Sequence, residues 1–361
     1  MLRLEARPQP SKLMSMLSPL LALVLTAILA AVLFAALGKD PLVGLGAFFV
    51  EPLRGVRQLT EVALKATPLI LCALGLAVCY RSNVWNIGAE GQFLLGILAG
   101  GGVALWLTVQ GIHLPKVVAV TLVLIGGVLG GMAWAAITAL LRDRFNASEI
   151  LVSLMLVYVA QQLVNYMVFG AWKDPMGFNF PQTKSFDAST WLPNLMSGSR
   201  LNIGFVIALA LVALTWVFMF RLFRGYQLQV GGLAPAAARY AGFSGSTSLW
   251  TALLISGGFA GLAGGIEVSG TFHQITPHVS TGLGFTAIIV CFVGRLHPVG
   301  IIFSGVLLST MIIGGELGQS RLGLPNALTG VFQGLLLVLL LACDTLIHYR
   351  IRVRSALAHA H

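Results

Sequence analysis

The residues best suited to binding a solute lie in a polar segment between two apolar stretches. The segment reads Arg-Ser-Asn-Val-Trp-Asn-Ile-Gly-Ala-Glu-Gly-Gln over residues 81–92, in a chain of 361 residues of which only 9% are charged. Hydrocarbon cannot hydrogen-bond to amides or carboxylates, so such groups persist at membrane depth only beside other protein or a water-filled cavity. We therefore expect a solute path at this segment.

The uncharged side chains of this segment suit the recognition of a base or a ribose. Paired donors and acceptors, which match base edges and ribose hydroxyls, are offered by three amides, Asn83, Asn86 and Gln92. The indole of Trp85 can stack on a planar ring, although a packing or interface role is the more common one for such a residue. For Asn86 a packing role and a solute contact are equally open.

Two carboxylates lie deep in apolar sequence and complete the set of candidate cavity residues. Glu90 can accept hydrogen bonds from a solute, pair with Arg81, or satisfy backbone amides at the break, and we favour this last, structural role. Glu267 can line the entrance of a pore, or it can extend its charged end to the outer interface, which we favour slightly.

The composition is that of a polytopic membrane protein, with 57% hydrophobic residues and a mean hydropathy of +0.90. The net charge of +10 comes from basic residues that lie mainly between apolar stretches, so it indicates topology rather than nucleic-acid binding. The His and Cys residues show no metal-ligand spacing, and no nucleophile–base group favours an integral-membrane enzyme. We expect no metal, no cofactor and no nucleic-acid partner.

Ten apolar stretches predict an all-α fold with about ten transmembrane helices, broken after the second. Each stretch is near the ~20 residues that a bilayer-crossing helix needs. They cover residues 17–38, 60–80, 91–110, 115–141, 149–170, 201–221, 247–270, 282–296, 298–315 and 325–346. We expect residues 1–361 to form a single transmembrane domain that contains all of them.

The charge bias places both termini in the cytoplasm. Basic residues concentrate at the N-terminus, in the turn with Arg142 and Arg144, and in a tail with Arg350, Arg352 and Arg354. With ten spans, residues 171–200 then form an external loop and residues 222–246 form a cytoplasmic loop.

The cytoplasmic loop predicts a short surface helix. Pro235 suits the first helical position, the alanines that follow it favour helix, and Gly242 can end it. Such a helix, bordered by glycines, suits docking into the groove of a partner. The residues that we assign to docking are Gly232, Pro235, Ala238, Arg239, Tyr240 and Gly242.

Four separated blocks resemble the permease subunits of ABC importers for sugars, nucleosides and branched-chain amino acids, most closely the nucleoside (simple-sugar-type) branch. The blocks are Asn86–Gln92, the pattern Gly-x-x-Pro-x-Ala-Ala-Arg-Tyr-Ala-Gly over residues 232–242, Ser256–Glu267, and Gly284–Ile288 followed by Gly294–Gly300. Two departures occur in the docking helix. Ala234 stands where the family commonly has Asn and cannot cap the helix, and Ala236 stands where an acidic residue is frequent.

The resemblance implies an importer permease for nucleosides or nucleobases in the bacterial cytoplasmic membrane. Its implied partners are an ATP-binding cassette subunit, a second permease that is a paralogue or an identical copy, an external substrate-binding protein, and membrane lipid. The chain has no Gly-x-x-x-x-Gly-Lys-[Ser/Thr] phosphate loop, so hydrolysis would fall to the partner.

Other transport functions stay open. The same machinery could carry a simple sugar or riboflavin. A self-sufficient secondary transporter would need ion-coupling carboxylates inside the spans and an internal repeat, and Glu90, Glu267 and Asp344 are few and dispersed for that role.

Glycines at four-residue spacing predict close packing between helices. The pairs are Gly126 with Gly130, Gly127 with Gly131, Gly257 with Gly261, and Gly261 with Gly265. The spacing leaves open whether the facing helix belongs to this chain or to a second permease.

Overall fold

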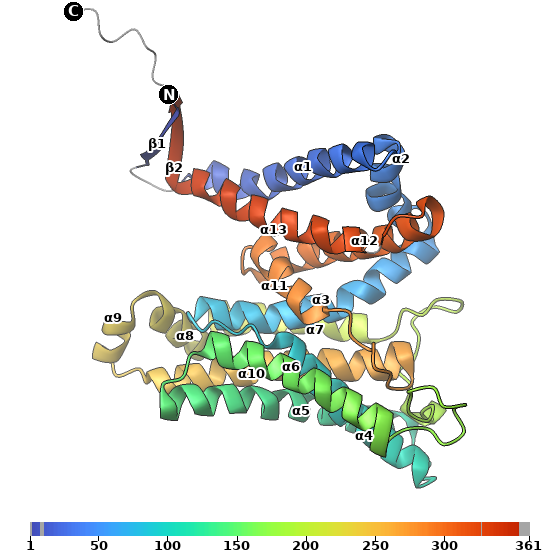
Figure 1. Ribbon diagram of the computed structural model, residues 1–361. Coiled ribbons are helices and arrows are strands. Elements are labelled where there is room, and N and C mark those ends of the chain that lie inside the picture. The colour runs from blue at the N-terminus through green and yellow to red at the C-terminus, as the bar shows by residue number, and fades with distance from the viewer. Residues whose placement is uncertain (1, 8–10, 326, 354–361) are drawn as a thin grey trace, which may run out of the picture. The chain divides into compact units, whose positions relative to one another are not determined.

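The structure of the chain, a computed structural model, describes residues 2–7, 11–325 and 327–353. It is almost entirely helical (Figure 1), which confirms the all-α, polytopic prediction. Of the described helices, nine are long and apolar enough to cross a membrane. They are α1 (Lys12–Ala36), α3 (Val56–Arg81), α4 (Ala89–Val109), α5 (Lys116–Phe145), α6 (Glu149–Tyr166), α7 (Gly204–Arg221), α10 (Gly245–Glu267), α12 (Pro298–Leu322) and α13 (Ala327–His348).

The remaining elements are short. They are β1 (Leu2–Ala6), α2 (Pro41–Leu45), η1 (Gly46–Val50), η2 (Glu51–Leu53), η3 (Met167–Ala171), η4 (Ala188–Thr190), α8 (Phe223–Leu233), α9 (Pro235–Tyr240), η5 (Val268–Phe272), α11 (Leu283–Val293) and β2 (Tyr349–Val353). The basic residue Arg354 of the predicted tail lies outside the described residues.

The predicted eighth span is the one that differs most from a full helix. Its helical part, α11, has 11 residues and is therefore about 16 Å long, roughly half of the ~30 Å hydrocarbon core. The chain before α11 is irregular, and its backbone is satisfied by protein. The Ile275 N–H donates to Thr183 Oγ1 at 2.9 Å, and the Ile275 carbonyl accepts from the Thr183 N–H at 3.0 Å.

The chain divides into two compact units, Met1–Arg54 with Thr310–His361, and Gly55–Ser309. In the first unit α1 packs on α13, and β1 pairs with β2 in an antiparallel ladder that sets Ala6 opposite Tyr349. The two ends of the described chain therefore lie together, and the prediction of ten spans with both termini in the cytoplasm stays a prediction. The prediction of one permease domain over the whole chain stays a prediction.

Glycines bring α5 and α10 of the second unit into backbone contact. A Cβ on Gly131 would lie 2.1 Å from the carbonyl oxygen of Gly257, and one on Gly261 would lie 2.2 Å from that of Gly127. No side chain fits at such distances, so any substitution there must separate the helices. For these glycines the facing helix is within the chain itself.

Candidate functional site

The predicted break is present as a turn, residues 82–88, that joins α3 to α4. The α3 helix closes with Asn83 in the left-handed region, at φ +55°. The Asn83 N–H donates to the Tyr80 carbonyl at 3.1 Å, and the Val84 N–H donates to the Cys79 carbonyl at 2.9 Å. This pattern caps a helix C-terminus, and Asn is the residue after Gly that best tolerates it. Asn83 thus has a backbone role that its side-chain chemistry did not predict.

Asn86 lies at the centre of a buried hydrogen-bond network. Its side chain is fully buried. Nδ2 donates to Ser256 Oγ at 2.9 Å and to Gln92 Oε1 at 3.1 Å, while Oδ1 accepts from the Gly88 N–H at 2.9 Å and from Gln92 Nε2 at 3.3 Å. Both donors and both acceptor positions of the amide are therefore used. This geometry supports the packing role, and solute contact by Asn86 or Gln92 stays a prediction.

Glu90 joins the start of α4 to the start of α11. Its carboxylate, 5% exposed, accepts from Ser280 Oγ at 2.5 Å and from the Gly284 N–H at 2.6 Å. A carboxylate is favourable at a helix N-terminus because the first N–H groups have no intrahelical partner. Glu90 therefore satisfies backbone amides, although they belong to α11 and not to its own turn.

Glu90 does not pair with Arg81, so that alternative is wrong. Arg81 instead links the end of α3 to three other parts of the second unit. Its Nε donates to the Leu296 carbonyl at 2.8 Å, its Nη1 donates to Gln229 Oε1 at 3.4 Å, and its guanidinium lies 5.0 Å from the Phe220 ring centroid. Solute contact by Glu90 stays a prediction.

Trp85 and Asn83 are the exposed members of the predicted set at the break. The indole is 41% exposed and donates to Asn83 Oδ1 at 3.1 Å. It lies against Tyr80 and Phe292, with ring centroids 5.3 and 6.4 Å apart. An indole and an amide are thus held side by side on apolar rings, a surface on which a planar ring could stack.

Glu267 is buried at 2% exposure, at the end of α10. The interpretation that its charged end extends to the outer interface is therefore wrong. The positive charges of Lys65 and Arg200 act on it, and Arg200 forms an ion pair with Glu61 at 2.6 Å. A place at a pore entrance stays a prediction for Glu267.

The predicted docking helix is α9. It begins at Pro235, as expected, and no side chain caps its start at Ala234. Its last residue is Tyr240, and Gly242, with a φ of +80°, follows two residues later and closes the helix end. The Gly242 N–H donates to the Arg239 carbonyl at 3.0 Å, and the Phe243 N–H donates to the Ala238 carbonyl at 2.9 Å, the paired bonds of a glycine-terminated helix.

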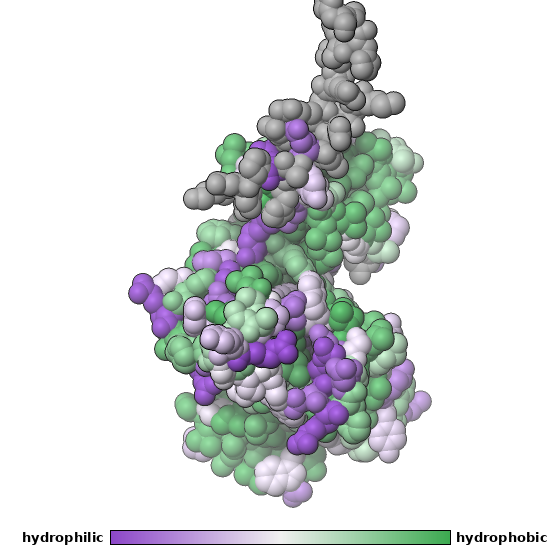
Figure 2. All heavy atoms as spheres, turned by 90° about the vertical axis from the view of Figure 1, so that its left-hand side faces the viewer, coloured by the Kyte–Doolittle hydropathy of each residue, from purple (hydrophilic) through white to green (hydrophobic). Residues whose placement is uncertain are grey.

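The outer surface of α9 is open to a partner. Ala238 is buried against the chain, whereas Pro235 and Arg239 are exposed and Tyr240 is 97% exposed. Figure 2 looks at the side of the molecule that carries α8 and α9, and hydrophilic side chains gather there between hydrophobic flanks. Such a surface suits contact with a water-soluble partner protein, but docking by the assigned residues stays a prediction.

The loop that carries α9 touches the break. A Cβ on Gly232, in α8, would lie 2.4 Å from the Arg81 carbonyl oxygen and 3.0 Å from the Asn83 nitrogen. Beyond this contact, a cavity of about 310 Å³ lies between the break and the loop that carries α9, and Ser82 lines it on one side and Pro235 on the other. Movement of α8 would therefore act directly on the end of α3.

The described residues offer little chemistry besides hydrogen bonding and stacking. They contain no group of three or more His, Cys, Asp or Glu side chains placed to hold a metal ion. The four cysteines are free and buried, and they are Cys72, Cys79, Cys291 and Cys343.

Comparison with known proteins gives a consistent picture. The family described as branched-chain amino acid transport system / permease component matches residues 58–341. The glucose ABC transporter permease protein TsgB13 of Haloferax volcanii is 33% identical, over 93% of this chain and 90% of its own. The guanosine ABC transporter permease protein NupP of Bacillus subtilis is 29% identical, over 91% and 93%. The nucleoside ABC transporter permease protein NupB of Lactococcus lactis is 28% identical, over 89% of each chain.

Proposed function

Because the chain belongs to the branched-chain amino acid transport system / permease component family, we propose that it imports nucleosides or nucleobases, driven by a separate ATPase subunit. It would do so in the bacterial cytoplasmic membrane, with both termini and the α8–α9 loop in the cytoplasm. A second permease, identical or paralogous, would complete the translocation pathway, and an external binding protein would deliver the solute.

The observation that carries the proposal is the backbone approach of α8 to the end of α3 at Gly232. An ATPase that pulls on α9 would move α8, and α8 lies so close to the end of α3 at Gly232 that a Cβ there would be only 2.4 Å from the Arg81 carbonyl oxygen, so the motion would be passed on to α3. Arg81 passes the displacement to the Leu296 carbonyl, and Glu90 ties the break to α11. The first turns of α4 and α11 would then be exposed alternately to one side of the membrane and to the other.

The choice of solute rests on the exposed surface at the break. Trp85 offers a ring for stacking, and Asn83 offers an amide beside it. A purine or pyrimidine has both a flat apolar face and a hydrogen-bonding edge, so it uses both groups at once. Two relatives that align over about nine-tenths of the chain carry the names of guanosine and nucleoside permeases, which favours the same class.

The decisive experiment is uptake into vesicles that contain the chain together with its copurifying ATPase. We expect ATP-dependent uptake of labelled guanosine or adenosine, lost in Arg239→Ala and kept in Arg144→Ala. Both arginines are exposed, so neither change should affect membrane insertion. Uptake by the chain without any ATPase, or full ATP-dependent uptake by Arg239→Ala, would refute the coupling.

A simple sugar is the second candidate, because the glucose permease TsgB13 shares 33% identity over 93% of the chain. An indole can also stack on a sugar ring, so the break alone does not separate the two solutes. Competition of labelled guanosine uptake by unlabelled adenosine, glucose, ribose and riboflavin would do so. ATP-dependent uptake of labelled glucose, with no uptake of labelled guanosine or adenosine, would replace the nucleoside assignment and leave the coupling intact.

A further inference from the structure

An apolar groove of about 640 Å³ runs along the second unit. Its walls come from α3, α5, α7 and α10, and its lining is apolar except for Thr215 and Thr251. Leu214, on one lip, is 61% exposed. The groove is formed by helices that cross the membrane, so its occupant must be an apolar molecule or segment that is stable in hydrocarbon.

The length of the groove matches one acyl chain of a lipid. Along α10 it extends from Thr251 to Leu262, which at 1.5 Å per residue is about 16 Å, close to the ~15 Å of one leaflet's hydrocarbon. A single acyl chain of a membrane lipid reaches about this depth.

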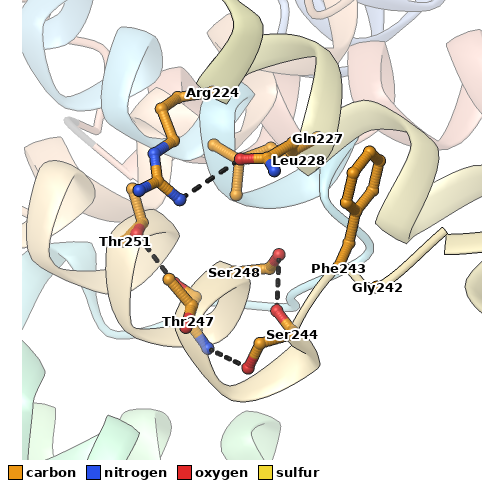
Figure 3. A pocket seen from close by; sticks show the side chains of 9 residues that line it. All are labelled: Arg224, Gln227, Leu228, Gly242, Phe243, Ser244, Thr247, Ser248 and Thr251. Atoms are coloured by element: carbon orange, nitrogen blue, oxygen red, sulfur yellow. Dashed lines mark hydrogen bonds between the residues drawn. The ribbon is translucent and has the colours of Figure 1, made fainter. Parts of the chain in front are cut away.

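A polar pocket of about 160 Å³ (Figure 3) adjoins the groove, and Thr251 lines both. Arg224 and Gln227 of α8 form one wall of this pocket, and Thr247 and Ser248 of α10 form another. The Arg224 guanidinium donates to Gln227 Oε1 at 3.2 Å. Among the ion pairs of the described residues none involves Arg224, so its charge lacks a protein counter-ion.

A cation without a protein counter-ion, placed beside a leaflet-deep apolar groove, is complementary to one kind of molecule. We propose that the second unit binds an anionic phospholipid from the leaflet that faces α8 and α9. Its phosphate would lie at Arg224, and one acyl chain would lie between α7 and α10. The headgroup pocket also includes Gly242 and Phe243 at the end of the docking loop, so bound lipid would brace that loop.

The test is lipid retention by the purified full chain, measured by native mass spectrometry after exchange into phosphatidylglycerol or phosphatidylcholine. We expect phosphatidylglycerol to be retained more strongly. Arg224→Gln should weaken that retention about fivefold, the contribution of one basic residue at a lipid surface, and leave phosphatidylcholine unchanged. Gly258→Leu, which points a larger side chain into the groove where the nearest atom is Met132 Cγ at 3.4 Å, should weaken retention of both lipids.

The controls separate this proposal from its rivals. Arg144→Gln removes an exposed charge outside the pocket and should retain lipid like the wild type. Equal retention of both lipids together with no effect of Arg224→Gln would overturn the proposal. A change in oligomeric state in Gly258→Leu with lipid retention unchanged would also overturn it, because the groove would then be an interface between copies. If Gly258→Leu fails to accumulate, the exposed site at Arg224 decides the question alone.

Discussion

Gly232→Ala tests the contact between the docking loop and the break more directly than any other change. Alanine is the better helix former, by about 0.8–1.0 kcal/mol over glycine. In an isolated α8 helix the substitution would therefore be stabilising. The packing predicts the opposite, since the new methyl group would lie 2.4 Å from the Arg81 carbonyl oxygen and 2.8 Å from the Ser82 carbonyl carbon.

The size of the effect follows from these distances. Ordinary contact begins near 3.4 Å, so α8 and the end of α3 must separate by about 1 Å, and both clashing atoms are backbone atoms that cannot rotate away. Overpacking of this kind costs about 1–3 kcal/mol. After subtraction of the helix-propensity gain, we expect the docked loop to be destabilised by up to about 2 kcal/mol. That corresponds to a decrease of up to about thirtyfold in the docked fraction.

The neighbouring residue supplies the matched control. A Cβ on Gly231 would meet only Ser248 Oγ, at 3.7 Å, so Gly231→Ala keeps the propensity gain without the clash. The assay is solute-stimulated ATP hydrolysis by the assembled importer, together with thermal unfolding of each variant. We expect Gly231→Ala to match or exceed the wild type and Gly232→Ala to lose stimulation while basal hydrolysis persists. Equal stimulation in the two variants would refute the idea that this contact transmits the motion.

Three further perturbations probe the break and the segment after η5. Glu90→Leu should lower the free energy of unfolding by about 2–4 kcal/mol, because it removes the two hydrogen bonds that the Glu90 carboxylate accepts from Ser280 and Gly284. Glu90→Gln should lower it by less, and thermal unfolding measures both variants. Asn83→Gly keeps the left-handed turn and should retain stability, whereas Asn83→Val should lower the free energy of unfolding by about 1–2 kcal/mol. Loss of uptake in the stable glycine variant would assign the amide to solute binding, and unchanged uptake would leave Asn83 a capping residue. Burial, aided by Lys116, lowers the pKa of His273 below its ordinary 6.5. The fold should therefore be most stable above that pH and lose stability as the pH falls through the folded pKa. His273→Asn, which suits the φ of +57°, should make the melting temperature less dependent on pH between about pH 7 and pH 5.

Features governed by local sequence could be predicted, and the docking helix is the clearest case. Pro235 at its start and Gly242 at its end act through their own backbone preferences, which do not depend on the rest of the fold. The long apolar helices were predictable for the same reason. The limits of α11 were not, because the apolar run continues to Leu296 while the backbone leaves the helix after Val293, with Arg295 and Leu296 both at positive φ.

The site residues show where sequence reasoning stops. Glu90 and Ser280 are 190 positions apart, so nothing near Glu90 could reveal that it would bind the start of another helix. Glu267 seemed free to reach water because it is near a predicted helix end, but burial is decided by the neighbours that the fold brings in. For Asn86, the type of side chain was informative about hydrogen bonding and uninformative about whether Gln92 and Ser256 would already use it.

The glycine contacts between α5 and α10 have a practical consequence for anyone who follows this transporter in motion. Where the main chains of Gly131 and Gly257 touch, no side chain can change its rotamer and the helices cannot move closer together, so the contact has no means of adjusting. Spectroscopic labels on the far faces of these two helices should therefore report a constant separation throughout the cycle. That fixed length gives an internal ruler against which displacements elsewhere in the second unit can be read.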